Sequence, residues 1–264
     1  MNLRRDLPAI LLLVALVLPQ LAAAQGFSAY VLPPRFEDSA AAGQTYRNVI
    51  EIQNTSPQAV RFGVRTADWD LDESGEIGFD EALAPDSCRP WVGLEALEIK
   101  LEGNGRKRFR FEVAVPEGTP ARQCRFAIMI EGDPQETTQG MSVSGRIGVV
   151  VYLDIGDVSA RLRVLESRIE VAGDRQLPAL LVANEGTAHG RLQGFVDGRD
   201  AQGRRWTFAP ASHPILPGRE RIIVLSPIGE PEGSEVPPVG FPVVISGSFD
   251  WRNERIPVDM TVGQ

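Results

Sequence analysis

Residues 140–154 read GMSVSGRIGVVVYLD, and this stretch near the middle of the chain decides the fold. One face of it is apolar, with Val143, Ile147, Val149, Val151 and Leu153 at even spacing. Ser142, Ser144, Arg146 and Gly148 lie on the other face. Alternation with a period of two predicts a half-buried β-strand. Because β-rich segments lie on both sides of it, we expect this strand to close a first domain and lead into a second.

Short alternating segments separated by turn residues continue outward from this strand in both directions. About seven of them lie between residues 27 and 155, and none has the period of a helix. Further segments follow up to residue 262. Short strands with frequent turns are typical of immunoglobulin-like sandwiches. We therefore predict an all-β fold of two immunoglobulin-like β-sandwich domains, residues 25–155 and 156–264, with a short connection that fixes their angle.

The N-terminus has the pattern of a secretory signal peptide. Arg4 and Arg5 precede an apolar run from residue 7 to 21, and three alanines end at Ala24. The run is about 15 residues long, shorter than the roughly 20 that a membrane-spanning helix needs. We predict that residues 1–24 are removed near Ala24, that the protein is exported to the periplasm, and that it is not inserted in a membrane afterwards.

The chain is acidic, with a formal net charge of −8. Loss of Arg4, Arg5 and Asp6 with the signal peptide removes a net +1, which leaves the mature chain at −9. Without a concentrated basic face, this charge argues against a nucleic-acid partner.

Two cysteines, Cys88 and Cys124, lie 36 residues apart in the first predicted domain. In an exported protein such a pair predicts one disulfide. In the chain-entropy model a loop of this length is worth about 4 kcal/mol of stability.

Residues 70–81 match the twelve-residue calcium loop of an EF-hand. The oxygen-bearing candidates are Asp70, Asp72, Ser74, Glu76 and Glu81. An EF-hand also needs a helix on each side, whereas a strand pattern precedes this loop and Pro85 follows it. We therefore favour an acidic β-hairpin with Ser74 and Gly75 at its tip, and keep calcium binding as the weaker alternative.

Catalytic motifs are missing from the sequence. The two histidines, His189 and His213, have neither metal-ligand spacing nor a neighbouring nucleophile motif. The chain also has no phosphate-binding loop and no dinucleotide fingerprint. We expect no enzymatic activity and no cofactor.

Two arginines mark the candidate binding site. Arg35 follows the Pro33-Pro34 kink of the first strand, and Arg146 lies on the polar face of the closing strand. The first and last strands are neighbours in an immunoglobulin-like sheet, so the two guanidinium groups can converge on a carboxylate. Two solvated surface arginines are the alternative.

Several short motifs follow one another over nearly the whole mature chain. They are residues 32–35 (LPPR), 50–55 (IEIQNT), 68–69 (DW), 87–92 (SCRPWV), 108–116 (RFRFEVAVP), 151–153 (VYL) and 184–189 (NEGTAH). In order and spacing, these motifs resemble those of the periplasmic pilus-assembly chaperones, the PapD-like family.

This resemblance implies an L-shaped pair of domains and a mechanism called donor-strand complementation, in which the last strand of the first domain is lent to a pilus subunit. The residues implied in subunit binding are the carboxylate anchors Arg35 and Arg146 and the edge residues Met141, Val143, Gly145 and Ile147. The implied partners are pilus or fimbrial subunits and an outer-membrane usher. The alternative function is an exported structural or adhesive protein of the same fold without chaperone activity.

Overall fold

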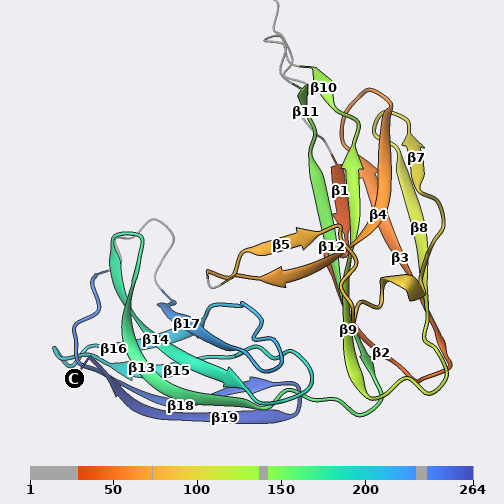
Figure 1. Cartoon of the computed structure of the whole chain (residues 1–264). Coiled ribbons are helices and arrows are strands. Elements are labelled where there is room, and N and C mark those ends of the chain that lie inside the picture. The colour runs from red at the N-terminus through yellow and green to blue at the C-terminus, as the bar shows by residue number, and fades with distance from the viewer. Residues whose placement is uncertain (1–28, 73, 137–141, 230–236, 264) are drawn as a thin grey trace, which may run out of the picture.

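The computed structural model describes residues 29–263, except residues 73, 137–141 and 230–236. The predicted signal peptide lies outside this range. Within the described residues the chain is almost wholly β, and the one helical element is the short 3-10 turn η2 (Arg89–Trp91). No helix in this part of the chain is long and apolar enough to cross a membrane. Strands β1–β12 and β13–β19 form two bodies set at an angle, so the molecule is L-shaped (Figure 1).

The first body is a sandwich of two sheets. One sheet has the order β1-β3-β8-β6, and the other has the order β2-β12-β9-β4-β5, with β7 also paired to β4. The strands are β1 (Ala29–Leu32), β2 (Arg35–Ala40), β3 (Thr45–Asn54), β4 (Val60–Leu71), β5 (Ile77–Asp80), β6 (Val92–Leu94), β7 (Glu98–Leu101), β8 (Arg106–Ala114), β9 (Arg122–Gly132), β10 (Gln135–Glu136), β11 (Ser142–Val143) and β12 (Arg146–Ile155).

The core of this sandwich follows from the alternation in the sequence. In β8, Arg108 and Arg110 are exposed, whereas Phe109, Phe111 and Val113 at the alternate positions are buried. They meet Phe126 and Ile128 of the facing sheet in one apolar cluster. The predicted immunoglobulin-like packing of the first body is therefore confirmed.

The stretch 140–154 forms two strands rather than one. Residues 142–143 are β11, which pairs with β10, and β12 begins at Arg146 after a break at Ser144 and Gly145. Val149, Val151 and Leu153 face the core, as the alternation predicts. The opposite face also becomes buried in its second half, because Val150 and Tyr152 lie beneath the joint between the two bodies.

The N-terminal strand changes sheets at its prolines. β1 pairs with β3, with Val31 opposite Ile52, whereas β2 runs parallel to β12, with Arg35 opposite Val150. Pro33 and Pro34 have no N–H group to continue the ladder with β3. The switch brings Arg35 beside the closing strand.

The second body is built on one sheet with the order β13-β14-β17-β16-β15-β18-β19. It curls until its two end strands approach, and the Ser167 hydroxyl donates to the Thr261 carbonyl at 3.2 Å. Phe208 and Phe249 are fully buried between its two halves. The strands are β13 (Leu162–Ala172), β14 (Arg175–Asn184), β15 (Val196–Arg199), β16 (Arg205–Pro210), β17 (Glu220–Pro227), β18 (Val243–Trp251) and β19 (Glu254–Val262).

Candidate functional site

The two predicted anchor arginines lie on one face of the same sheet. Arg35 pairs with Val150 of β12, and Arg146 lies four residues before Val150 on the same strand. Side chains alternate along a strand, so Arg35, Arg146 and Val150 all point toward the second body. Four residues correspond to about 13 Å along the strand. The backbone positions that carry the two arginines thus lie on either side of Gly148.

The predicted subunit-binding edge is partly free. β2 covers β12 from residue 150 to 155, and in the described part of the chain no strand pairs with the same edge at residues 146–149. Of the predicted edge residues, Met141 lies outside the described range, and Val143 belongs to the β10–β11 pair. Gly145 lies in the break between β11 and β12. Ile147 packs against the core of its own domain.

A carboxylate next to Arg35 organises a charged cluster at the joint. Glu37 accepts from Arg35 at 2.7 Å, and it lies 3.4 Å from Arg191 and 3.5 Å from His189 of the second body. Burial alone would raise the pKa of Glu37. The hydrogen bond to His189 and the charges of Arg191 and Arg35 outweigh that effect and hold this pKa at about 2. Glu37 is therefore ionised and links the two bodies.

His189 is the centre of the joint. Its ring is fully buried and stacks on Tyr152 with centroids 3.8 Å apart. Gln123 accepts from the His189 backbone N–H and places its own amide nitrogen 2.9 Å from Nδ1. That nitrogen is a donor, so Nδ1 must be the unprotonated acceptor. Burial lowers the pKa of His189, which keeps the imidazole neutral.

The same network extends to the end of β12. The Gln123 amide also donates to Asp154 at 2.6 Å, and Arg252 of the second body donates to the other oxygen of Asp154 at 2.8 Å. Arg191 donates to the Ser212 carbonyl at 2.7 Å. The Arg191–Ser212 bond lies within the second body, whereas the contacts of Gln123 with His189 and of Asp154 with Arg252 cross the joint and fix the orientation of one domain against the other.

An apolar cluster lies beside the polar one. Leu216 of the second body packs against Trp69 and Tyr152 of the first, and all three are buried. Trp69 is oriented by a hydrogen bond from its ring nitrogen to the Phe126 carbonyl at 3.1 Å. Arg125 lies over the Trp69 ring at 5.4 Å from its centroid. The joint is thus a continuous packed interface.

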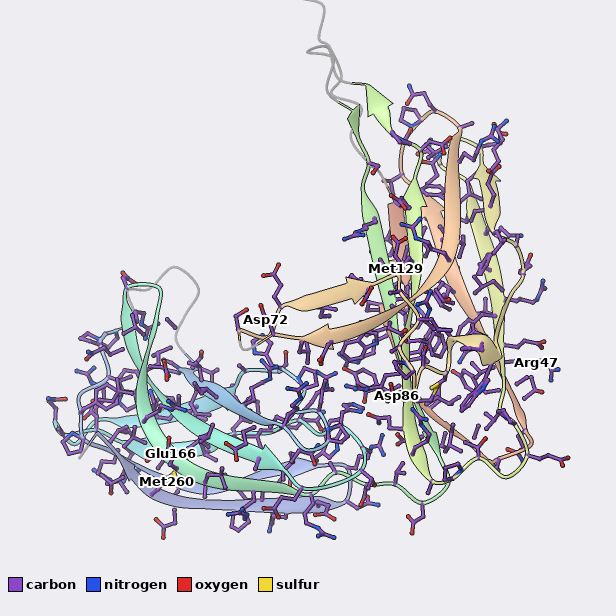
Figure 2. The ribbon with its side chains drawn as sticks, viewed as in Figure 1. Arg47, Asp72, Asp86, Met129, Glu166 and Met260 are labelled. Carbon is purple, nitrogen blue, oxygen red and sulfur yellow. A yellow bond between two sulfur atoms is a disulfide. The ribbon has the colours of Figure 1, made fainter. Side chains whose placement is uncertain are left out.

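The β4–β5 hairpin bridges the angle between the domains. β4 pairs with β9 only up to Ala67 and then leaves the sheet to pair with β5. The hairpin projects toward the second body, and Asp72 lies near its end (Figures 1 and 2). Arg219 contacts Asp70 at 3.3 Å, and Arg221 donates to the Asp72 carbonyl at 2.9 Å.

This hairpin is the acidic loop that also matched a calcium site. The favoured interpretation, a β-hairpin, is confirmed by the β4–β5 pairing. Its acidic side chains have other partners: Asp70 contacts Arg219, Glu81 contacts Arg65 at 2.8 Å, and Asp72 accepts from Ser74 and from the Glu76 backbone. Within the described ranges, no three acidic, histidine or cysteine side chains gather to hold a metal.

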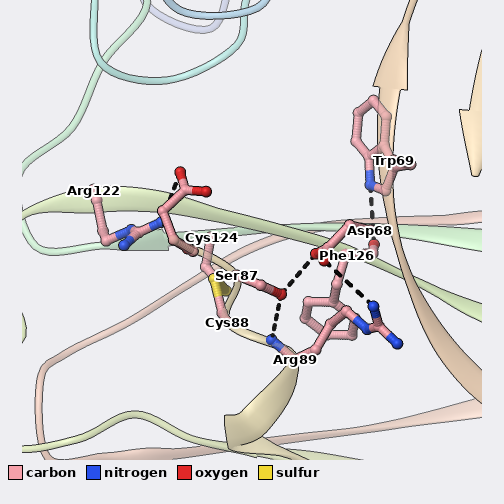
Figure 3. The surroundings of a disulfide bond; sticks show 9 residues. Asp68, Trp69, Ser87, Cys88, Arg89, Arg122, Cys124 and Phe126 are labelled. Carbon is pink, nitrogen blue, oxygen red and sulfur yellow. Dashed lines mark hydrogen bonds and ion pairs between the residues drawn. A yellow bond between two sulfur atoms is a disulfide. The ribbon is translucent and has the colours of Figure 1, made fainter. Parts of the chain in front are cut away.

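The predicted disulfide between Cys88 and Cys124 is present and buried (Figure 3). It ties the segment that follows the hairpin to β9. Ser87 donates to Asp68 at 2.7 Å, and Arg89 contacts the other oxygen of Asp68 at 3.3 Å. The β4 strand is thereby fixed at the base of the hairpin, so the position of the hairpin is set by the first domain.

The residues at the centre of the joint were not predicted from the sequence. Tyr152 and His189 were noted only within the stretches 151–153 and 184–189 that carry the resemblance, and Glu37 and Arg191 carried no motif. Glu37 and Arg191 are 154 residues apart in the chain. No local spacing marks residues that meet across two domains.

Comparisons with known proteins show the fold. No protein-family model matches the chain, and no curated protein matches its sequence. A chain in the structure of the Salmonella enterica SafA pilin in complex with the SafB chaperone is similar to it, with a TM-score of 0.50, 14% identity, and coverage of 90% of this chain and 99% of the other. The class 5 fimbriae chaperone CfaA gives a TM-score of 0.48 at 10% identity, with coverage of 90% and 100%.

A third similar structure is the CsuC–CsuE chaperone–tip adhesion subunit complex of Acinetobacter baumannii, with a TM-score of 0.47, 10% identity, and coverage of 90% and 100%. The SafB comparison, with its TM-score of 0.50, supports a shared fold, and at 14% identity it shows nothing beyond the fold. The chain is a two-domain, immunoglobulin-like β-sandwich protein.

Proposed function

We propose that this protein is a periplasmic chaperone of pilus or fimbrial subunits. It binds a subunit by lending the edge of β12 as a donor strand, holds the subunit until assembly, and delivers it to an outer-membrane usher. This role involves no catalysis. In this proposal residues 1–24 are the signal peptide, residues 25–155 form the subunit-binding domain, and residues 156–264 form the second domain.

The observation that carries the proposal is the edge of β12 at residues 146–149, with which no described strand pairs on the β2 side. An exposed edge presents backbone N–H and C=O groups that an incomplete sheet of another protein can pair with. The edge lies between two arginines of the same face, which suits the terminal carboxylate of a bound chain. The fold shared with a chain of the SafB complex supports the same role.

The test is recovery of a subunit from the periplasm. We expect the tagged protein to be found in the periplasmic fraction and to co-purify with a subunit that is unstable alone. Arg35→Ala and Arg146→Ala should each reduce recovery, and Arg47→Ala, an exposed arginine on β3 outside this face, should leave it unchanged. In the complex, amide hydrogen exchange at residues 146–149 should slow. Surface or medium localisation without a bound subunit would favour the adhesive alternative.

A further inference from the structure

Gly148 lies at the centre of the proposed anchor site. It is two residues from Arg146 and two from Val150, the partner of Arg35, and its face is the one that carries both arginines. A terminal carboxylate held by both guanidinium groups would therefore lie over Gly148. This position lacks a side chain, so the backbone of β12 is open there unless another group covers it.

The ring of Phe79 covers Gly148. A Cβ atom at residue 148 would overlap Phe79, so this ring rests directly on the β12 backbone. Phe79 belongs to β5, and it packs half-buried against the apolar cluster of Trp69, Tyr152 and Leu216. The place between the two anchor arginines is thus filled by the chain's own hairpin.

The hairpin is held in this place from the opposite domain. Arg219 contacts Asp70, and Arg221 donates to the Asp72 carbonyl. At the tip, Gly75 has a φ of +90° and approaches His213 closely, which leaves little room for a side chain. Both domains therefore contribute to keeping Phe79 over Gly148.

Arg35 is also occupied. Its Nε lies 2.7 Å from Glu37, whose other contacts are to His189 and Arg191. Among the described residues no ion pair involves Arg146, which is exposed. One anchor thus has an internal carboxylate and the other is free.

We propose that the subunit-binding cleft is occupied by the protein itself, with Phe79 of the β4–β5 hairpin in the place of the incoming chain end and Glu37 on Arg35. This proposal rests on the proposed function and adds its regulation: a peptide with a free C-terminal carboxylate binds only when the hairpin moves away from Gly148. The apparent affinity is then reduced by the fraction of molecules in which the hairpin is displaced.

The experiment measures binding of a synthetic peptide of alternating valine and threonine with a free C-terminal carboxylate, and of the same peptide amidated. Phe79→Ala should bind the carboxylate peptide about tenfold or more tightly than the unaltered protein. The matched control is Leu83→Ala, which removes an exposed apolar side chain beyond the hairpin and should change nothing. For the amidated peptide, Phe79→Ala should increase the affinity much less than it does for the carboxylate peptide.

A second variant keeps the core of the hairpin intact. Arg219→Glu with Arg221→Glu should release the tip through charge repulsion and increase peptide binding in the same direction. Equal affinity of Phe79→Ala and the unaltered protein, or no binding by either, would overturn the self-occupied cleft. If Phe79→Ala gains nothing but the unaltered protein still recovers a subunit, the chaperone role stands without this regulation. If the variant gains affinity and no subunit is ever recovered, the occluded site stands and the chaperone role falls.

Discussion

Replacement of Leu216 by alanine should separate the two domains more effectively than removal of any ion pair between them. Leu216 is 4% exposed and is the residue through which the second domain enters the apolar cluster around Trp69 and Tyr152. Leu→Ala deletes three carbon atoms, which at about 0.8 kcal/mol each corresponds to roughly 2 kcal/mol of lost transfer free energy. A partly collapsed cavity adds to this, so we expect a total loss of about 2–4 kcal/mol.

The ion pair between Asp70 and Arg219 offers the contrast. Its side chains are 57% and 66% exposed, and exposed pairs contribute about 0–1 kcal/mol because water and salt screen them. Asp70→Asn should therefore cost less than 1 kcal/mol. Leu97→Ala, which removes a side chain that is 74% exposed, is the control for the alanine substitution itself and should be neutral.

Urea denaturation followed by tryptophan fluorescence measures these differences, because Trp69 and Trp251 both lie at the joint. We expect Leu216→Ala to lower the free energy of unfolding by the amount given above and to split unfolding into separate domain transitions. Small-angle scattering should show a wider range of interdomain angles. A loss below 0.5 kcal/mol, or an equal loss in Asp70→Asn, would refute the view that apolar packing holds the joint.

Acid, reduction and loss of one buried amide should each weaken the protein in a distinct way. Burial lowers the pKa of His189 below its ordinary 6.5, so below pH 6.5 the unfolded chain binds more protons than the folded one, and stability should fall as the pH is lowered. Glu37, with a pKa of about 2, should add a further loss of stability below pH 4.5. His189→Gln should flatten the first of these losses in urea titrations at a series of pH values. Reduction of the Cys88–Cys124 disulfide, which joins residues 36 positions apart, should lower the free energy of unfolding by about 4 kcal/mol. A melting temperature unchanged by dithiothreitol would contradict this. Asn184→Ala should lower the free energy of unfolding by about 3 kcal/mol, because the buried amide donates to two carbonyls and accepts from two backbone N–H groups. An unchanged melting temperature in this variant would contradict the prediction.

Local patterns in the sequence were sufficient for the disulfide and for strands such as β8, although the stretch 140–154, predicted as one strand, forms β11 and β12. Apolar alternation in residues 106–115 predicted β8, since the period of side chains in a strand is fixed by the backbone. Two cysteines in a chain predicted to be exported left one pairing, and the structure has it. The composition of residues 70–81 likewise predicted a turn between two strands.

The joint could not be predicted in this way, because its members come from distant segments. Tyr152 lies off the apolar face that the alternation predicts, and no local pattern indicates that its ring stacks on His189 of the other domain. Phe79 lies within the acidic stretch 70–81, and no local pattern places it on Gly148. Such contacts depend on the angle between domains and on where β4 leaves its sheet, and neither is encoded in a short window of sequence.

The apolar half of the joint has a consequence for the order in which the chain is made. Synthesis begins at the N-terminus, so Trp69, Met129 and Tyr152 are in place on the first domain before Leu216 exists to cover them. A nascent or truncated chain that ends at residue 155 carries this patch uncovered, and uncovered apolar surface promotes self-association. The second domain therefore shields an apolar surface of the first domain from solvent. An isolated first domain would need polar replacements at Trp69 and Met129 to remain monomeric.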